Sequence, residues 1–110
     1  MCFIRYASTK ELGSKNSKLS PIKVNTTTIV VFKEIHQYLL KNAYEEVSVR
    51  EDYLDLFGIK NNFEISFNIL SSEGKSYVAI SVYSEKRRLS TKKVLNNVYE
   101  EIENLLERYM

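Results

Sequence analysis

The chain has 110 residues, 27% of them charged and 44% hydrophobic, with a formal net charge of +2 at pH 7. This length fits one domain with one continuous core, and this composition excludes a mainly disordered chain. A charge of +2 is too small to argue for nucleic acid, and a single cysteine excludes an internal disulfide. Because the sequence holds no apolar run of membrane length, we expect a cytoplasmic protein, which leaves peripheral association with a membrane open.

The positive charge is concentrated at the start of the chain. Residues 1–24 hold five basic residues and one acidic residue, a net charge of +4, which leaves −2 for residues 25–110. The stretch from Gly13 to Lys18 is small and polar, with neither a helical nor a strand period. We therefore predict a flexible basic tail over residues 1–20, with a short extended start, and a single domain over residues 21–110.

The domain is predicted to begin with a short edge strand over residues 22–24 and a helix over residues 26–42. Asn25 or Thr26 is the expected N-cap of this helix. Its apolar residues recur at steps of three and four and form one stripe, which consists of Ile29, Phe32, Ile35, Leu39 and Ala43.

The pattern between this helix and residue 63 is short and mixed. Val47 and Val49 alternate with polar neighbours, which predicts a strand within residues 46–50. Residues 53–57 are predicted to form one helical turn that Gly58 ends.

A β-hairpin is predicted over residues 63–83, because apolar and polar residues alternate strictly in two successive runs. Its apolar face consists of Phe63, Ile65, Phe67, Ile69, Val78, Ile80 and Val82. A four-residue turn over residues 71–74 sets the predicted register, which places Phe67 opposite Val78 and Asn68 opposite Tyr77.

A second helix is predicted over residues 90–109, with Ser90 as its cap. Its stripe, at steps of three and four, consists of Val94, Leu95, Val98, Ile102, Leu105, Leu106 and Tyr109. The predicted fold class is therefore α+β, with two amphipathic helices packed on one face of a small antiparallel sheet built around the central hairpin.

The sequence offers no convincing catalytic or metal-binding pattern. His36 is the only histidine and Cys2 the only thiol, and neither a glycine-rich phosphate loop nor a zinc-ligand motif occurs. Glu51, Asp52 and Asp55 are close in sequence but lack the ligand spacing of a calcium loop. We expect a protein that is not an enzyme and that has no cofactor-binding or metal-binding residues.

The polar face of the hairpin is the first candidate contact surface. Its candidate residues are Asn68, Tyr77 and Tyr83. Tyrosines on a sheet stack on nucleic-acid bases, pair across exposed strands, or pack against another protomer, and the sequence leaves these three alternatives open.

A basic patch at the start of the last helix is the second candidate. It consists of Lys86, Arg87, Arg88, Lys92 and Lys93, and it opposes the helix dipole. Such a patch suits an acidic partner, whether lipid head groups, protein carboxylates or RNA phosphates; the alternative is a solvated helix start.

The order of elements resembles the bacterial alkaline-shock and general-stress envelope protein family. The likeness covers residues 22–107 and is carried by the helix from Ile29 to Ala43, the run Val47-Ser48-Val49, the two hairpin strands and the helix from Val94 to Leu106. It differs in lacking a glycine after the first helix and in ending on a helix. The resemblance implies a small non-catalytic cytoplasmic adaptor or scaffold of the stress response and cell-envelope homeostasis, acting through self-association or partner docking.

A hairpin followed by a long helix is also similar to ribosome-associated factors, of the hibernation-factor type and of the KH-like binding-factor type. That resemblance implies a small ribosome- or RNA-associated protein. Those families are basic across the folded domain, whereas residues 25–110 here carry −2. The charge therefore favours the adaptor interpretation over the RNA interpretation.

Overall fold

The computed structural model describes residues 5–8, 21–84 and 91–110. Within them the chain forms six strands, two α-helices and two short 3-10 turns. The strands are β1 (Arg5–Ser8), β2 (Ile22–Val24), β3 (Glu45–Arg50), β4 (Asp55–Lys60), β5 (Phe63–Ser72) and β6 (Lys75–Ser84). The helices are α2 (Thr28–Lys41) and α3 (Thr91–Leu106), and the 3-10 turns are η1 (Glu51–Tyr53) and η2 (Glu107–Tyr109).

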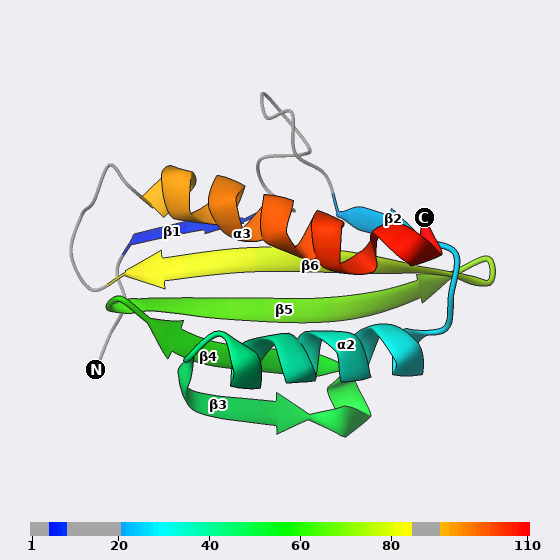
Figure 1. Ribbon diagram of the computed structural model, residues 1–110, viewed down its shortest axis with the longest axis horizontal. Helices are drawn as coiled ribbons and strands as arrows, with labels where there is room; N and C mark the ends of the chain where they lie inside the picture. The colour runs from blue at the N-terminus through cyan, green and yellow to red at the C-terminus, as the bar shows by residue number, and fades with distance from the viewer. Residues whose placement is uncertain (1–4, 9–20, 85–90) are drawn as a thin grey trace.

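All six strands belong to one antiparallel sheet (Figure 1). The order is β1–β6–β5–β4–β3, and β2 also pairs with β6. Because β1 pairs with residues 81–84 and β2 with residues 76–78, the two short strands share one edge position along β6. The predicted α+β class, with an antiparallel sheet and two helices, is confirmed, and the predicted strands near residues 22–24 and 46–50 are present as β2 and β3.

Part of the predicted tail belongs to this sheet. Residues 5–8 pair with β6 as β1, and they extend the sheet beyond the predicted domain start at residue 21. The other residues of the predicted tail, 1–4 and 9–20, lie outside the described residues.

The two long central strands are joined by a tighter turn than we predicted. Only Glu73 and Gly74 separate β5 from β6, so Phe67 pairs with Ile80 and Asn68 with Ala79. The predicted four-residue turn and its register are therefore wrong. Both turn residues have a positive φ, 52° and 76°, as a type I′ hairpin turn requires. Every pair shifts by two residues, so each side chain keeps its predicted face.

Residues 55–60 form a strand, and the predicted helical turn over residues 53–57 is wrong. The 3-10 turn η1 ends at Tyr53, and Leu54 takes a left-handed φ of 54° that redirects the chain. β4 then runs between β3 and β5. Gly58 lies against Tyr44, where a Cβ atom would come within 3.1 Å of two Tyr44 carbons. The glycine therefore makes room for an aromatic ring rather than ending a helix.

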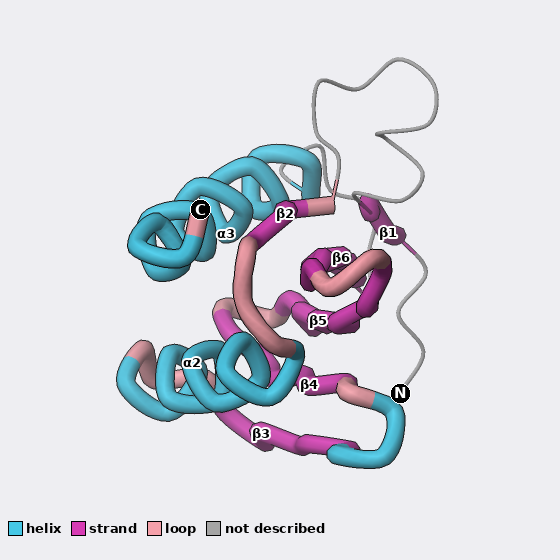
Figure 2. The backbone as a smooth tube through the Cα atoms, turned by 90° about the vertical axis from the view of Figure 1, so that its right-hand side faces the viewer, coloured by secondary structure: helices cyan, strands magenta, loops and turns pink. Residues whose placement is uncertain are grey.

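The core lies between the sheet and the helices. Figure 2 shows α2 and α3 on the same side of the sheet. From the helices, the fully buried side chains include Val31, Ile35, Leu39, Leu95, Ile102 and Leu106. They meet Phe67, Ile80 and Val82 of the central strands in one cluster. Each such side chain contributes about 1.5–3 kcal/mol when it is removed from water.

The first helix begins one residue later than the predicted caps allow. Thr27 is the N-cap, and its hydroxyl accepts a hydrogen bond from the Val30 amide at 3.4 Å. At the other end, the Tyr44 amide donates to the Leu39 carbonyl at 3.3 Å, and Ala43 between them has a φ of 59°. This is the left-handed helix ending that glycine usually provides.

The C-terminal turn fastens α3 to α2. The Tyr109 hydroxyl donates to Glu34 Oε2 at 2.8 Å, Arg108 forms an ion pair with the same carboxylate, and the Asn25 amide donates to the Tyr109 carbonyl at 2.8 Å. The Tyr109 hydrogen bond, and after it the Arg108 hydrogen bond, lower the pKa of Glu34. The ionised form of Glu34 is therefore the one that holds the C-terminal turn against α2.

Replacing Ala43 with glycine should stabilise the protein. Alanine pays a steric cost in the left-handed region that glycine does not pay, so we expect Ala43→Gly to raise the free energy of unfolding by about 1 kcal/mol. Urea denaturation measures this change. Lys41→Gly, inside the last turn of the same helix, is the matched control and should lose about 1 kcal/mol. A loss in both variants would contradict the left-handed backbone at Ala43.

Glu34→Gln should weaken the protein in a pH-dependent way. The folded pKa is below the unfolded one, so the stabilisation is complete above the unfolded pKa and disappears as the pH falls through the folded pKa. The hydrogen bond from Tyr109 alone is worth about 1 kcal/mol. Thermal unfolding at pH 7 should therefore give a lower melting temperature for the variant than for the parent, and this difference should shrink at an acid pH below the ordinary pKa of a glutamate. An equal difference in melting temperature at both pH values would show that ionisation of Glu34 does not contribute to stability. Glu100→Gln, at an exposed position, is the control.

Candidate functional site

No described helix covers the face of the sheet that is turned away from α2 and α3 (Figure 2). We call it the open face. Along β5, the core residues Phe63 and Ile65 are buried, while Glu64 and Ser66 between them are partly exposed on the open face. An antiparallel sheet commonly leaves one face to solvent, and exposed apolar side chains that gather on such a face mark an interaction site, so this face is the leading candidate site.

The strand pairing arranges the open face in rows that cross the sheet. The first row, at the β4–β5 turn end, has two acidic residues and consists of Glu45, Ile59, Glu64 and Tyr83. The second row has mostly small residues and consists of Ser48, Phe57, Ser66 and Ser81.

The remaining rows lead to the opposite, basic end of the open face. The middle row consists of Arg50, Asp55, Asn68 and Ala79. The fourth row consists of Leu70, Tyr77 and Lys23, and the last contains Ser72 and Lys75. Charge and side-chain size therefore both change along the strands.

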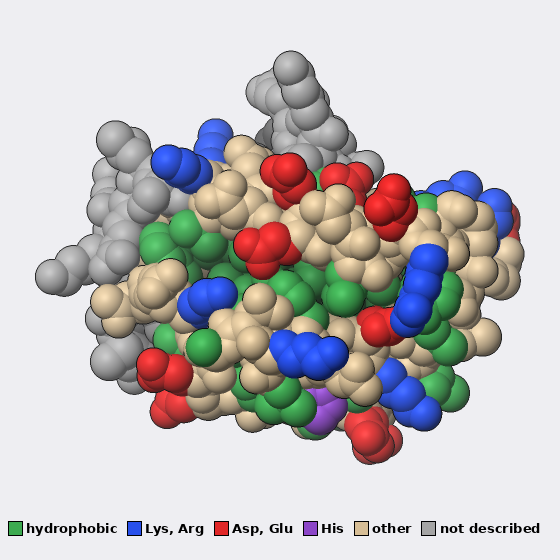
Figure 3. Space-filling view, in the orientation of Figure 1, with side chains coloured by type: hydrophobic (Ala, Val, Ile, Leu, Met, Phe, Trp, Pro, Cys, Tyr) green, Lys and Arg blue, Asp and Glu red, His purple; other side chains and the backbone are tan. Residues whose placement is uncertain are grey.

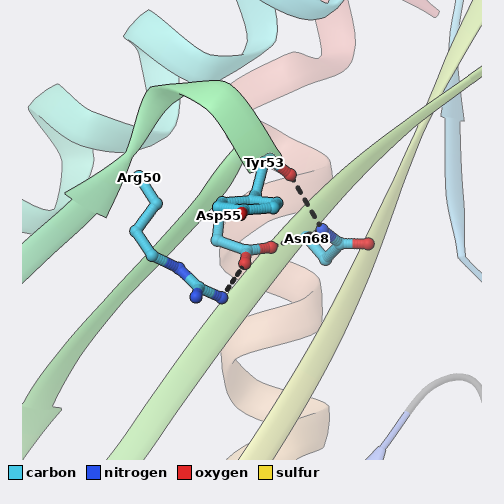
Figure 4. Close-up of polar contacts among 4 residues, drawn as sticks. All are labelled: Arg50, Tyr53, Asp55 and Asn68. Carbon is cyan, nitrogen blue, oxygen red and sulfur yellow. Dashed lines mark hydrogen bonds and ion pairs between the residues drawn. The ribbon is translucent and has the colours of Figure 1, made fainter.

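Polar contacts fix the middle row, as Figure 4 shows. Asp55 forms an ion pair with Arg50 and accepts a hydrogen bond from the Asn68 side chain. The Asn68 amide group also lies 3.4 Å from the Tyr53 carbonyl, and the Arg50 guanidinium lies 4.9 Å from the centre of the Tyr53 ring. These contacts join β3, β4 and β5 and leave the Asp55 charge compensated.

The predicted face residues share the open face but do not form one cluster. Asn68 pairs with Ala79 and binds Asp55, whereas the predicted register placed it opposite Tyr77. Tyr77 pairs with Leu70 and Lys23, and Tyr83 pairs with Glu64 three rows away. Both tyrosines are partly exposed.

The acidic trio does not assemble into a metal site. Glu51 and Asp52 lie exposed in η1, while Asp55 turns to Arg50 and Asn68. Within residues 5–8, 21–84 and 91–110, no three His, Cys, Asp or Glu side chains are placed to hold a metal ion. His36 is partly exposed and stacks edge-on with Phe32, and Cys2 lies outside these ranges.

Only part of the predicted basic patch can be placed. Lys92 and Lys93 are exposed in the first turn of α3, and Lys86, Arg87 and Arg88 lie outside the described residues. Acidic side chains gather further along α3, among them Glu100 and Glu101 (Figure 3). The patch as a whole stays a prediction.

A small cleft on the helix side was not predicted. Its volume is about 200 Å³, and it lies between α3 and the β4–β5 turn. Its polar lining is Tyr44, Lys60, Asn61, Asn97 and Glu101, around the apolar side chains of Phe63, Ile65, Val94 and Val98. Small-molecule sites are usually about 300–1,000 Å³, so this cleft is a weaker candidate than the open face.

Two buried tyrosines hold the carboxylate at the rim of this cleft. The Tyr38 hydroxyl donates to Glu101 and lies 3.2 Å from the Tyr44 hydroxyl. Since the single Tyr38 proton goes to Glu101, Tyr44 is the donor to Tyr38. Burial raises the pKa of both phenols, and the hydrogen bond to Glu101 raises that of Tyr38 further. A raised pKa keeps both phenols protonated at neutral pH, so Tyr44, Tyr38 and Glu101 form a continuous chain of hydrogen bonds.

No sequence signal identifies this network. Tyr38 lies in the predicted first helix, but Tyr44 and Glu101 come from a loop and from the polar side of the last helix. Only the tertiary packing brings the three together. Sequence alternation does, however, assign Tyr77 and Tyr83 to the correct face.

Neither described helix is long and apolar enough to cross a bilayer. Comparison of the chain with protein-family models, with curated protein sequences and with solved structures finds no match. The case for function therefore depends on the open face and on the chemistry of the rows that cross it.

Tyr38→Phe should destabilise the protein by about 1–2 kcal/mol, because it removes a donor to Glu101 and the acceptor for Tyr44. Urea denaturation at pH 7 measures the loss. The control, Tyr53→Phe, changes a ring that is 67% exposed, and it should be close to neutral. Equal stability of the parent and Tyr38→Phe would show that the network contributes nothing.

Proposed function

We propose that this protein is a non-catalytic cytoplasmic adaptor or scaffold, which acts by binding a protein partner through the open face. The fold that supports this role has two amphipathic helices packed on one face of a sheet built around the β5–β6 hairpin. The other face is then left for a partner. The observation that carries the proposal is the partly exposed set of Phe57, Ile59, Leu70, Tyr77 and Tyr83 on that face.

Aromatic and aliphatic side chains between charged ends are typical of a protein-binding surface. Tyrosine and phenylalanine supply contact area at a low cost in conformational entropy, and charges at the rim set the orientation. Membership of the alkaline-shock and general-stress envelope family is part of this proposal. The order of helix, strands, hairpin and helix supports it, although β4 stands where the likeness had an irregular segment. A role in envelope stress would then follow.

An RNA- or ribosome-associated role is the second candidate. Tyr77 and Tyr83 on one sheet face favour it, because exposed sheet tyrosines stack on unpaired bases. Glu45, Glu64 and the compensated Asp55 lie on the same face and oppose phosphate binding. Lys23 and Lys75 give the face only one basic end. The protein partner is therefore favoured.

Removing two apolar groups from the open face should abolish partner binding. We expect the tagged double variant Leu70→Ser, Tyr77→Ser, isolated from the native host, to lose its specific partner at least about tenfold, since hot-spot residues contribute on this scale. Quantitative mass spectrometry of the co-purified proteins measures the loss. The matched control is Ile29→Ser, Leu40→Ser, which removes two side chains of α2 that are 62% and 63% exposed.

The two candidate functions give different results in this experiment. A protein retained by the parent and the control but lost from the open-face variant supports the adaptor. Ribosomal subunits or RNA lost in the same pattern support the second candidate. Equal recovery of every partner with all three proteins would reject the open face as the functional surface.

A further inference from the structure

The edges of the sheet are poor sites for self-association. In β3 the register shifts between Glu45 and Ser48, and Glu46 has a φ of 48°, which interrupts the ladder. The other edge is divided between two strands of four and three residues. Bulges, charges and short edge strands block the addition of a further strand. A second copy of the chain would therefore have to bind a face rather than an edge.

The charges of the open face are separated along the two central strands. Lys75 lies at the β5–β6 turn, next to Ser72, and Lys23 lies beside Tyr77 at the same end. Glu64 lies near the opposite end, beside Tyr83 and Ile59. Turning the face end over end places each basic end on the acidic end of an identical face.

Side-chain sizes on β5 and β6 follow the same relation. Tyr77 and Leu70 form a row of large side chains two residues from the middle row. Ser81 and Ser66 form a row of small side chains two residues away on the other side. Ala79 and Asn68 lie between these rows. When a second copy is turned by 180° about the middle row, its row of small side chains therefore lies over the row of large side chains of the first copy.

We propose that the open face binds a second copy of this chain in a face-to-face dimer. The two-fold axis lies between the two sheets, perpendicular to β5 and β6, along the row of Ala79 and Asn68. Tyr77 then packs over Ser81 of the second copy, and Leu70 over its Ser66. Lys75 comes next to Glu64 of the second copy, and this pair occurs twice. The inference rests on the proposed function and names its partner.

The other two-fold arrangement fits worse. With the axis parallel to the strands, each row meets the same row of the second copy, so Tyr77 meets Leu70, serine meets serine, and the two acidic rows lie together. Large side chains would then clash where small ones leave voids, and like charges would repel. In the proposed arrangement Asp55 lies near its own copy, but Arg50 and Asn68 compensate its charge.

A second copy also explains the surface better than an unrelated partner. In a two-fold dimer both copies use the same patch. If one residue of the first copy contacts a second residue of the other copy, the same contact is therefore repeated with the two copies exchanged. Both the charge order and the size order of β5 and β6 meet this condition. An unrelated partner places no such condition on the sequence.

Charge reversal tests the proposed pairing. Sedimentation equilibrium should show a dimer for the parent protein, and Lys75→Glu and Glu64→Lys should each weaken dimerisation about tenfold or more, because each creates two like-charge contacts. An equimolar mixture of the two variants should form a heterodimer, since both contacts are then between opposite charges. Lys33→Glu and Glu100→Lys, at exposed positions on α2 and α3, are the controls and should dimerise like the parent.

A cysteine crosslink tests the position of the axis. In a Cys2→Ser background, Asn68→Cys lies beside its own copy and should be joined by a short bismaleimide. Ser72→Cys, on the same strand but four residues away, lies over Glu64 of the second copy and should not be joined to itself. Equal crosslinking at both positions, or at Ser72→Cys alone, would overturn the proposed arrangement.

The outcomes separate this inference from the proposed function. A monomer at every soluble concentration would overturn the dimer, while loss of a partner from the Leu70→Ser, Tyr77→Ser variant would still support an adaptor. A dimer that resists both charge reversals would also overturn the proposed arrangement. A salt-sensitive dimer that the mixed variants restore supports it.

Discussion

The pairing of β5 with β6 is the constraint on which the rest of the structure depends. These are the two longest strands, and ten residue pairs join them from Phe63–Ser84 to Ser72–Lys75. Two tight turns with positive φ at both residues, Asn61–Asn62 and Glu73–Gly74, fix the ends of β5. Because side chains alternate between faces, this one register determines both the core layer under the helices and the rows of the open face.

The polar groups on the helix side stabilise the contact between α2 and α3. Tyr38, Tyr44 and Glu101 connect the end of α2 to α3, and Tyr109 and Arg108 bind Glu34 near the other end of the same helix pair. In the described residues, no buried side-chain nitrogen or oxygen lacks a hydrogen-bond partner. These polar groups therefore take part in the packing of α2 against α3.

The sequence predicts those parts of the fold that repeat a period, and it fails where the period is broken. Alternation over Phe63–Ile69 and Val78–Val82 is long enough to assign the hairpin and its faces. The turn length is not encoded in that alternation, so the register was predicted two residues away from the observed one. β4 was missed because Leu56 and Phe57 are both apolar on opposite faces, which hides the period of two. Because Asp55 was assigned to a helical turn, its contacts with Arg50 and Asn68 on the sheet could not be predicted.

The composition of the open face separates two kinds of binding surface. A site for one small ligand needs an enclosed volume with convergent polar groups. The cleft beside Glu101 provides little enclosed volume, about 200 Å³. The open face is instead broad and partly apolar, with opposite charges at its two ends. Because the two ends of the open face carry opposite charges, one end would always repel a uniformly charged polymer and so weaken its binding. The same two ends strengthen binding to a surface with the reverse order of charge, and the same face turned end over end has that order.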